Sequence, residues 1–313
     1  MYRGGAADND EPAGAPARGK LSVDLGRCHA PPPTRPPRSI AVCVDDFGLH
    51  AGINAAAVQL ARLGRVNAIS CLVGGPAWSA GSSLLSQLDA PAIDIGLHLD
   101  LTEFPLMTGS RRGLPWLIAS AYCRRLAPQQ LRNEICAQLD AFEDAMGRAP
   151  AFVDGHQHVH QLPLVRDALL AVLGLRGPAR PWLRGTRQPC VACVTWPEPP
   201  AQRRKARLIE ALGAQALGRL ARERGHAQNR HLLGVRDFGA GGPGYGQLVR
   251  GWLARAGDGD LLMCHPSLRV AVRDPILAAR AVEYEFLCAP AFATALAEAG
   301  IGLWPMGRML ALA

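Results

Sequence analysis

The chain has 313 residues, of which 49% are hydrophobic and 5% aromatic, and it carries a formal net charge of +8 at pH 7. This composition supports a sizeable core, whereas the scarcity of aromatic residues argues against a base-stacking surface for nucleic acid. No run of about 18 apolar residues predicts a transmembrane helix, and nine cysteines without regular spacing favour reduced thiols. We therefore expect a cytoplasmic globular protein that does not bind nucleic acid.

The N-terminal stretch, residues 1–37, is rich in Gly, Ala, Pro, Asp and Arg and ends in a proline-rich run. Such a stretch buries too little apolar surface to offset the entropy that is lost on ordering. It also lacks the apolar segment of a signal peptide, because acidic and small residues follow Arg3. We expect a disordered tail over residues 1–37 and a folded domain over residues 38–313.

From residue 40 onward, short apolar runs alternate with helical patterns. The expected strands cover residues 40–44, 68–73, 93–101, 151–154, 182–183, 232–235, 261–264 and 301–303. The expected helices cover residues 53–63, 77–88, 128–146, 162–173, 201–224, 247–256, 276–287 and 290–299. This alternation predicts a single-domain α/β fold, a regular or distorted (β/α) barrel of seven or eight mostly parallel strands, rather than a doubly wound sheet.

Residues 154–160 read Asp-Gly-His-Gln-His-Val-His and hold three of the nine histidines. If a strand runs through them, alternate side chains project to one face, namely those of Asp154, His156, His158 and His160. A carboxylate and imidazoles gathered in this way indicate a metal site or acid–base chemistry. The alternative is that one or two of these histidines are hydrogen-bonded structural residues.

Other polar residues accompany the predicted strands. Asp45 and Asp46 follow the first strand, His98 lies on the third and His265 follows the seventh. In a (β/α) barrel the active site gathers at the C-terminal ends of the strands, so these groups would meet residues 154–160 at one rim. Two adjacent carboxylates repel each other, and a cation or a shared proton would relieve this repulsion. For one aspartate a helix N-cap is the ordinary alternative, and His98 and His265 could each be structural.

One subset of these residues has the composition of a catalytic metal site. Asp46, His98 and His156 would form a set of two histidines and one carboxylate, which leaves positions open for water and substrate. Nitrogen ligands favour zinc or another transition ion over magnesium. His265, at the end of another strand, would be available as a general acid.

These residues lie in motifs that resemble the YdjC-like family, the ChbG/HpnK carbohydrate deacetylases. The matching motifs are VDDFG at 44–48, GLHLDLT at 96–102, DGHQHVH at 154–160 and MCHP at 263–266. They occur in the order of the family and spread over about residues 39–305. The resemblance implies a distorted (β/α) barrel and a metal-dependent hydrolase that removes acetyl groups from N-acetylated sugars.

The resemblance also implies roles for individual residues. Asp46, His98 and His156 match the metal ligands of the family, Asp45 its catalytic base and His265 its late histidine. One divalent ion, zinc or magnesium, would be the cofactor, and an N-acetylated sugar or glycolipid would be the substrate. Adjacency alone does not decide which aspartate is the base and which is the ligand.

Further residues are weaker candidates for orienting the ligands or contacting the substrate. Asp154, His158 and His160 could hold the metal ligands in place or touch the sugar. Trp182 and Arg184, at the end of a short strand, could stack on the sugar and hydrogen-bond to it. For Trp182, packing in the core is the alternative.

A run of basic residues lies on the predicted helix at 203–224. Such a run is usually a solvated helix face, and contact with an anionic membrane is the functional alternative. Two rival functions remain at this point: a phosphoester hydrolase, which would be expected to hold two metals, and a basic membrane- or nucleic-acid-binding protein with a non-catalytic site. The sequence is compatible with a homo-oligomer but does not predict one.

Overall fold

Strand β1 (Ser39–Phe47) is buried along its whole length and lies in the middle of the sheet. Its side chains alternate between two apolar clusters. Ile40 and Val42 belong to the larger cluster, whereas Ala41 and Cys43 belong to a smaller one that also contains Trp182. A parallel strand that is buried on both faces has a continuous apolar sequence, which is why residues 40–44 were recognisable as a strand.

The computed structural model describes residues 1, 38–88, 92–107, 109, 111–190, 199–238 and 244–312. The predicted tail therefore lies outside the described residues, apart from Met1. Contacts group Arg35–Ala313 into one compact unit. Within the described residues, no helix is both long and apolar enough to cross a membrane.

All eight predicted strands are present in the described part of the chain. After β1 they are β2 (Ala68–Cys71), β3 (Asp94–Leu99), β4 (Phe152–Gly155), β5 (Trp182–Leu183), β6 (Leu232–Leu233), β7 (Leu261–Cys264) and β8 (Gly302–Leu303). The α-helices are α1 (Ala51–Arg62), α2 (Trp78–Leu85), α3 (Leu114–Tyr122), α4 (Pro128–Met146), α5 (Val165–Leu175), α6 (Pro200–Ala211), α7 (Ala214–Glu223), α8 (Tyr245–Arg255), α9 (Leu277–Cys288), α10 (Pro290–Glu298) and α11 (Met306–Ala311).

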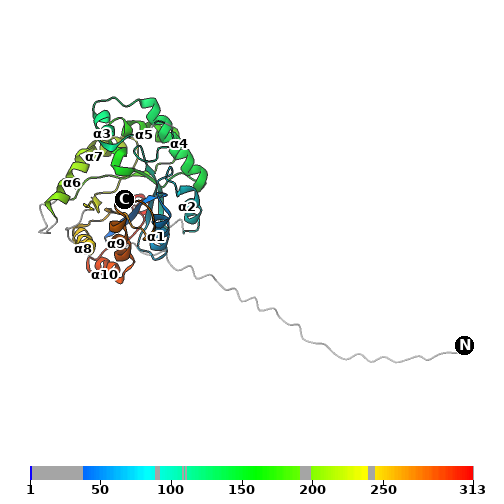
Figure 1. Ribbon diagram of the computed structural model, residues 1–313, viewed down its shortest axis with the longest axis vertical. Coiled ribbons are helices and arrows are strands. Elements are labelled where there is room, and N and C mark those ends of the chain that lie inside the picture. Colours follow the sequence, from blue (N-terminus) through cyan, green and yellow to red (C-terminus); the bar gives the residue numbers. More distant parts are fainter. Residues whose placement is uncertain are drawn as a thin grey trace, which may run out of the picture. The chain divides into compact units, whose positions relative to one another are not determined.

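The strands form one parallel sheet in the order β5-β4-β3-β2-β1-β7-β6, and β8 pairs with the start of β1. The segment between residues 227 and 232 joins the two edge strands: the Leu183 N–H donates to the Ala227 carbonyl oxygen at 2.9 Å, and the Leu232 N–H donates to that of Arg187 at 2.8 Å. Helices surround the strands (Figure 1). The predicted distorted (β/α) barrel of mostly parallel strands is confirmed.

Three helical features differ from the sequence-based expectation. The predicted helix over 201–224 is two helices, α6 and α7, because Gly213 between them has a φ of 144°. A Cβ at Gly213 would lie 2.2 Å from the Gln161 carbonyl oxygen, so this close approach requires glycine. Helices α3 and α11 were not predicted. Helix α3 buries only Leu117, Ser120 and Ala121, so its sequence lacks a clear amphipathic period.

Gly96 on β3 provides a test of the packing inside the barrel. A Cβ at Gly96 would lie 2.4 Å from the Phe152 ring, and this ring is stacked on Trp182 with centroids 4.3 Å apart. We expect Gly96→Ala to lower the free energy of unfolding by about 1–3 kcal/mol, because overpacking displaces both rings. Urea denaturation would measure the change. Gly174→Ala on α5 is the matched control, since its Cβ would meet no atom within 4 Å; equal losses in both variants would contradict this account.

Candidate active site

Asp45 and Asp46 both reach the C-terminal end of the barrel because β1 is irregular at this point. Its register with β2 shifts between Val44 and Phe47, and Asp46 has a φ of 65°. A bulge of this kind re-aims side chains that would otherwise point to opposite faces. Both aspartates are 2% exposed. A left-handed backbone at a buried aspartate is strained, and such strain is typical of functional sites.

Asp46 is the centre of a cluster with two histidines. Its Oδ1 lies 2.9 Å from His156 Nδ1 and 3.4 Å from His98 Nε2. One ligand atom from each residue can be chosen so that all three lie within 4.8 Å of one another. The structure thus brings together the three residues that the sequence suggested as metal ligands, although they lie on β1, β3 and the segment after β4.

The ring of His98 is oriented from its other side. His98 and Asp154 are direct partners in the register of β3 and β4, and the His98 Nδ1–H donates to Asp154 Oδ1 at 2.7 Å. Ser70 on β2 donates to the same oxygen at 2.5 Å. A carboxylate on the far nitrogen fixes the tautomer and the angle of a metal-binding histidine. Asp154 therefore orients the ring of His98, and its role beside a metal stays a prediction.

The electrostatics of the cluster favour a bound cation. Burial alone would raise the pKa of Asp46, but Arg280 and His156 outweigh it and hold that pKa well below its ordinary value. Burial opposes charge on His98 too, yet Asp154 and Asp46 raise its pKa to about 9. Asp46 likewise raises the pKa of His156. The carboxylate thus attracts positive charge from both rings, and a divalent ion could replace the protons there.

The donor set fits a transition ion. It offers two imidazole nitrogens and one carboxylate oxygen, which is a common set for a catalytic zinc and also serves other divalent ions. The buried Nε2 of His156 makes no hydrogen bond in the described structure, although Glu103 Oε1 lies 3.4 Å away.

A second acidic cluster lies beside the first but already contains a cation. Cys43, Asp45 and Asp154 could also offer three ligand atoms. The Arg184 guanidinium lies among them: it donates to both oxygens of Asp45 at 2.6 Å, and its Nη2 lies 2.5 Å from Asp154 Oδ2 and 3.1 Å from Cys43 Sγ. Arg184 has no exposed surface, so the idea that it hydrogen-bonds a sugar is corrected. Its contacts orient Asp45 and Asp154.

His265, which follows β7, also approaches Asp45. Its Nε2 lies 3.9 Å from Asp45 Oδ2, and its backbone N–H donates to the buried Glu283 on α9 at 2.6 Å. The ring also packs edge-on against Phe238. Burial lowers the pKa of His265, which makes its protonated form a stronger acid.

The hypothesis that a strand continues through residues 154–160, with alternate side chains on one face, is wrong. β4 ends at Gly155, and His156–Gln161 form a 3-10 helix in which Gln157 and His158 have φ angles of 52° and 61°. The three histidines therefore do not share a face. His156 turns toward Asp46, whereas the fully buried His160 donates from Nε2 to the Arg184 carbonyl oxygen at 2.9 Å. His160 therefore supports Arg184, and because it is fully buried the hypothesis that it contacts a sugar is wrong.

Of the two roles suggested for Trp182, stacking on a sugar and packing in the core, the structure supports packing in the core. It is 3% exposed, stacks on Phe152 and donates from its indole nitrogen to Asp94 at 3.1 Å. It does not line the cavity described below. Trp182 is a core residue, because its ring packs against that of Phe152 in the smaller apolar cluster.

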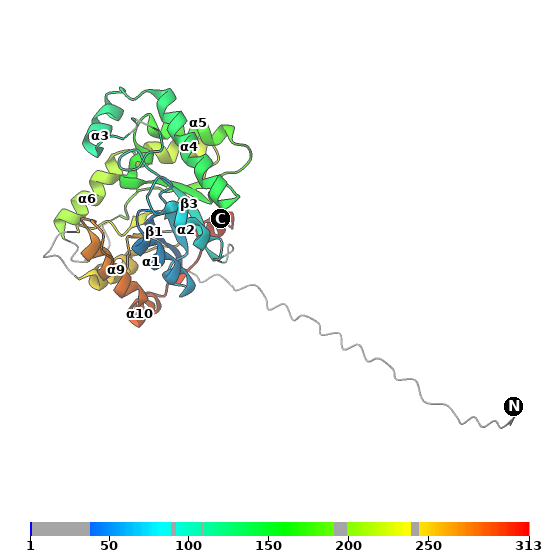
Figure 2. The ribbon, with the colours of Figure 1, turned by 45° about the vertical axis from the view of Figure 1, so that its right-hand side comes forward.

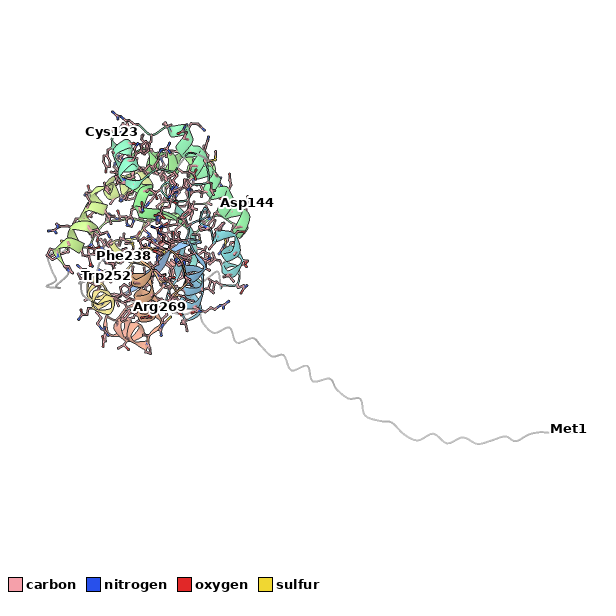
Figure 3. All side chains as sticks on the ribbon, viewed as in Figure 1. Met1, Cys123, Asp144, Phe238, Trp252 and Arg269 are labelled. Atoms are coloured by element: carbon pink, nitrogen blue, oxygen red, sulfur yellow. The ribbon has the colours of Figure 1, made fainter. Side chains whose placement is uncertain are left out.

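A cavity of about 760 Å³ opens over the cluster, and Asp45, Asp46, His98, His156, His158 and His265 are all among its lining residues. Its walls are largely apolar and come from α3 (Leu114, Ile118), α6 (Leu208, Ile209) and the segment before α9. In both views α6 lies between α3 and α9 (Figure 1, Figure 2). In Figure 3 the label Cys123 shows where α3 ends, and the label Phe238 shows a residue of the cavity lining.

A family model described as YdjC-like protein matches residues 39–298 of the chain. The chain belongs to the YdjC-like family. The resemblance seen in the four motifs is thereby confirmed, and the matched region contains β1 to β7 and every residue of the site described above.

Two relatives of this YdjC-like protein carry functional names. The carbohydrate deacetylase of Homo sapiens is 31% identical over 257 residues, which cover 74% of this chain and 76% of that protein. The chitooligosaccharide deacetylase of Salmonella paratyphi B is 33% identical over 150 residues, so the match covers 45% of this chain and only 58% of that relative.

A solved structure supports the fold of the YdjC-like domain. A crystal structure from Enterococcus faecalis V583, of a protein named for a proposed role in cellobiose-phosphate cleavage, superposes with a TM-score of 0.60. The two chains are 17% identical, and the match covers 88% of this chain and 99% of the other.

Some residues of the site were not recognised from the sequence. Arg280 and Glu283 on α9 contact Asp46 and the His265 backbone, and Glu103 approaches His156. Charged residues on a helix usually face solvent, so Arg280 and Glu283 gave no local signal. Their one distinguishing feature is that they are three residues apart and so share a helix face.

Arg184→Met tests the charge arrangement around Asp45. Removing this cation leaves two buried carboxylates without their partner, so we expect the free energy of unfolding to fall by about 3–5 kcal/mol. The matched control is Arg219→Met, which removes an exposed ion pair with Glu223 and should cost less than about 1 kcal/mol. Urea denaturation of both variants measures the difference, and similar small losses would contradict the role assigned to Arg184.

His160 should make the fold sensitive to acid. Burial lowers the pKa of His160 from 6.5 to about 4, so between these values the unfolded chain binds a proton that the folded chain does not. Stability from this group is therefore present above pH 6.5 and is lost as pH falls, by about 2 kcal/mol between pH 7 and pH 5. His160→Gln, which keeps a donor for the Arg184 carbonyl, should reduce that loss in urea denaturation; an unchanged loss would refute the assignment.

Proposed function

We propose that this YdjC-like protein is a metal-dependent carbohydrate N-deacetylase, which hydrolyses the N-acetyl group of an amino sugar to acetate and the free amine. The observation that carries the proposal is the Asp46–His98–His156 cluster beside Asp45 on the floor of a large cavity. The family and the two named deacetylase relatives support the same activity.

The proposed ligands of the divalent ion are Asp46, His98 and His156. When bound, the ion would supply Lewis-acid chemistry, which polarises a carbonyl group and makes water more acidic. Zinc suits the two nitrogen donors better than magnesium does. Asp154 would keep the His98 ring in one tautomer and orientation, so that Nε2 faces Asp46.

Asp45 is proposed as the general base that removes the proton from the attacking water. Arg184 donates to both of its oxygens, which fixes the orientation of the carboxylate. His265, 3.9 Å from Asp45 Oδ2, is placed to give a proton to the departing sugar nitrogen, which is a poor leaving group without one. In this assignment Asp45 is the base and Asp46 the ligand, because Asp46 is the aspartate that contacts both histidines.

The proposed substrate is amphiphilic: an N-acetylated sugar that carries an apolar group, as in a glycolipid. Sugar rings are polar, yet apolar side chains such as Ile118, Leu208 and Val272 form much of the cavity wall. Leu208 and Val272 are 62% and 41% exposed, and exposed apolar side chains beside a site indicate an apolar partner. Basic residues of α6, including Arg203 and Arg204, would then meet an anionic membrane surface.

The free thiols of the described cysteines, from Cys43 on β1 to Cys288 at the end of α9, are suited to a reducing compartment. We therefore include a cytoplasmic location in the proposal.

Acetate release is the direct test of the activity. Purified protein would be incubated with N-acetylated chito-oligosaccharides and N-acetylated glycolipids, with added zinc, added magnesium or a chelator. We expect metal-dependent acetate release, and we expect Asp45→Asn and His156→Ala to lower kcat/KM by about a hundredfold or more. Asp144→Asn, an exposed carboxylate on α4 that is labelled in Figure 3, should leave it unchanged. Acetate release that persists in Asp45→Asn and with chelator would contradict the proposal.

A substitution in the apolar wall tests the substrate class. Leu208→Ser removes an exposed side chain of the cavity, so it should raise KM severalfold for a glycolipid while leaving kcat and the KM for a short chito-oligosaccharide unchanged. Leu175→Ser is the control, because Leu175 is 85% exposed and lies outside the cavity lining. An equal change in KM for both substrates would show that the cavity wall does not bind an apolar group of the substrate.

A further inference from the structure

Helix α9 carries two charged side chains that are buried rather than solvated. Arg280 is 3% exposed and Glu283 is 1% exposed, and their spacing of three residues places them on one face of the helix. Removing charged groups from water costs free energy unless they are paired and hydrogen-bonded. Each of the two residues has a hydrogen-bond partner in the candidate active site: Glu283 accepts from the His265 backbone N–H, and Arg280 donates to Asp46.

Arg280 contacts the one oxygen of Asp46 that the histidines do not. Its Nη2 donates to Asp46 Oδ2 at 2.7 Å, whereas His156 Nδ1 and His98 Nε2 face Oδ1. The carboxylate is thus held by one oxygen while the other is directed toward the two rings. Asp46 needs such a restraint, because it lies on an irregular part of β1 with a strained backbone.

The guanidinium is itself anchored to the wall of the cavity. Its Nε donates to Asp274 Oδ2 at 2.7 Å, and the same oxygen lies 3.2 Å from His50 Nε2, just before α1. Asp274 and its neighbours line the cavity. The backbone joins these segments as well, because the Ser267 N–H donates to the Arg280 carbonyl oxygen and the Leu268 N–H donates to that of Gly52.

We propose that Arg280 is a positioning residue for the metal ligand Asp46, and that Asp274 and His50 hold Arg280 in place for this purpose. The inference rests on the proposed function, because it assumes that Asp46 binds a divalent ion. It goes further in naming a residue of α9, outside the four motifs, whose geometry sets the affinity of the site. In this role Arg280 acts through Asp46 and is a positioning residue rather than a catalytic one.

Two effects of Arg280 on metal affinity have opposite signs, which makes the proposal testable. As a positive charge close to the site, Arg280 repels a divalent cation, so charge alone predicts tighter binding when it is removed. As a restraint on the carboxylate, Arg280 predicts weaker binding when it is removed, by about tenfold or more, the effect usual for a residue that orients a metal ligand.

The experiment is a titration of metal-free protein with Zn²⁺ against a chromophoric chelator, with the wild type, Arg280→Met and Arg280→Lys. We expect Zn²⁺ affinity to fall at least about tenfold in Arg280→Met, and to fall in Arg280→Lys as well, since an ammonium cannot hold Asp46 and Asp274 in the same fork geometry. Arg269→Met is the matched control. It removes an exposed ion pair with Glu285, which lies on α9 as Arg280 does, and it should leave the Zn²⁺ affinity unchanged.

A spectroscopic readout separates positioning from a general loss of structure. The visible absorption spectrum of the Co²⁺-loaded protein reports the geometry of the ligands, so it should change in Arg280→Met and stay unchanged in Arg269→Met. Asp274→Asn, which leaves Arg280 intact, should weaken Zn²⁺ binding by a smaller factor.

Two results would overturn the proposal. The first is a folded Arg280→Met variant that binds Zn²⁺ as tightly as the wild type, or more tightly, with an unchanged Co²⁺ spectrum; this would leave the proposed function intact. The second is a wild-type protein that binds neither ion, which would remove the metal site and with it the proposed function.

Discussion

The buried guanidinium of Arg184 is the interaction on which the rest of the site depends. A cation without any exposed surface is tolerated only when carboxylates surround it, and Asp45 and Asp154 supply that charge from β1 and β4. The same contact fixes both carboxylates, which would otherwise repel each other. Arg184 directly follows the edge strand β5, and His160 holds its backbone by a hydrogen bond to the carbonyl oxygen.

Positive and negative groups alternate outward from that guanidinium. One oxygen of Asp154 contacts Arg184, and the other contacts His98. The other nitrogen of His98 faces Asp46, and Arg280 contacts Asp46 in turn. Each buried charge is therefore stabilised by a neighbour of opposite sign, and each contact also fixes an orientation. The proposed base and the proposed metal ligands thus belong to one network, although they come from elements that lie far apart in the sequence.

The sequence predicted the strands and the cluster well, because strand ends in a parallel barrel share one rim and the motif residues lie at those ends. Asp45, Asp46, His98, Asp154, His156 and His265 all line or support the same cavity for that reason. The prediction failed where backbone irregularity decides direction: β4 ends at Gly155, and the left-handed residues Gln157 and His158 that follow break the alternation of side chains that a strand would continue. It also missed α3 and the inward face of α9, because their roles depend on tertiary contacts that no local pattern records.

The most direct test of the central claim is the location of the metal in a crystal soaked in Zn²⁺, measured by anomalous diffraction. The account predicts one strong peak at about 2.0–2.2 Å from Asp46 Oδ1 and from a ring nitrogen of His98 and of His156, with Arg184 still between Asp45 and Asp154. A peak among Cys43, Asp45 and Asp154 with Arg184 displaced, or no peak at either cluster, would contradict it.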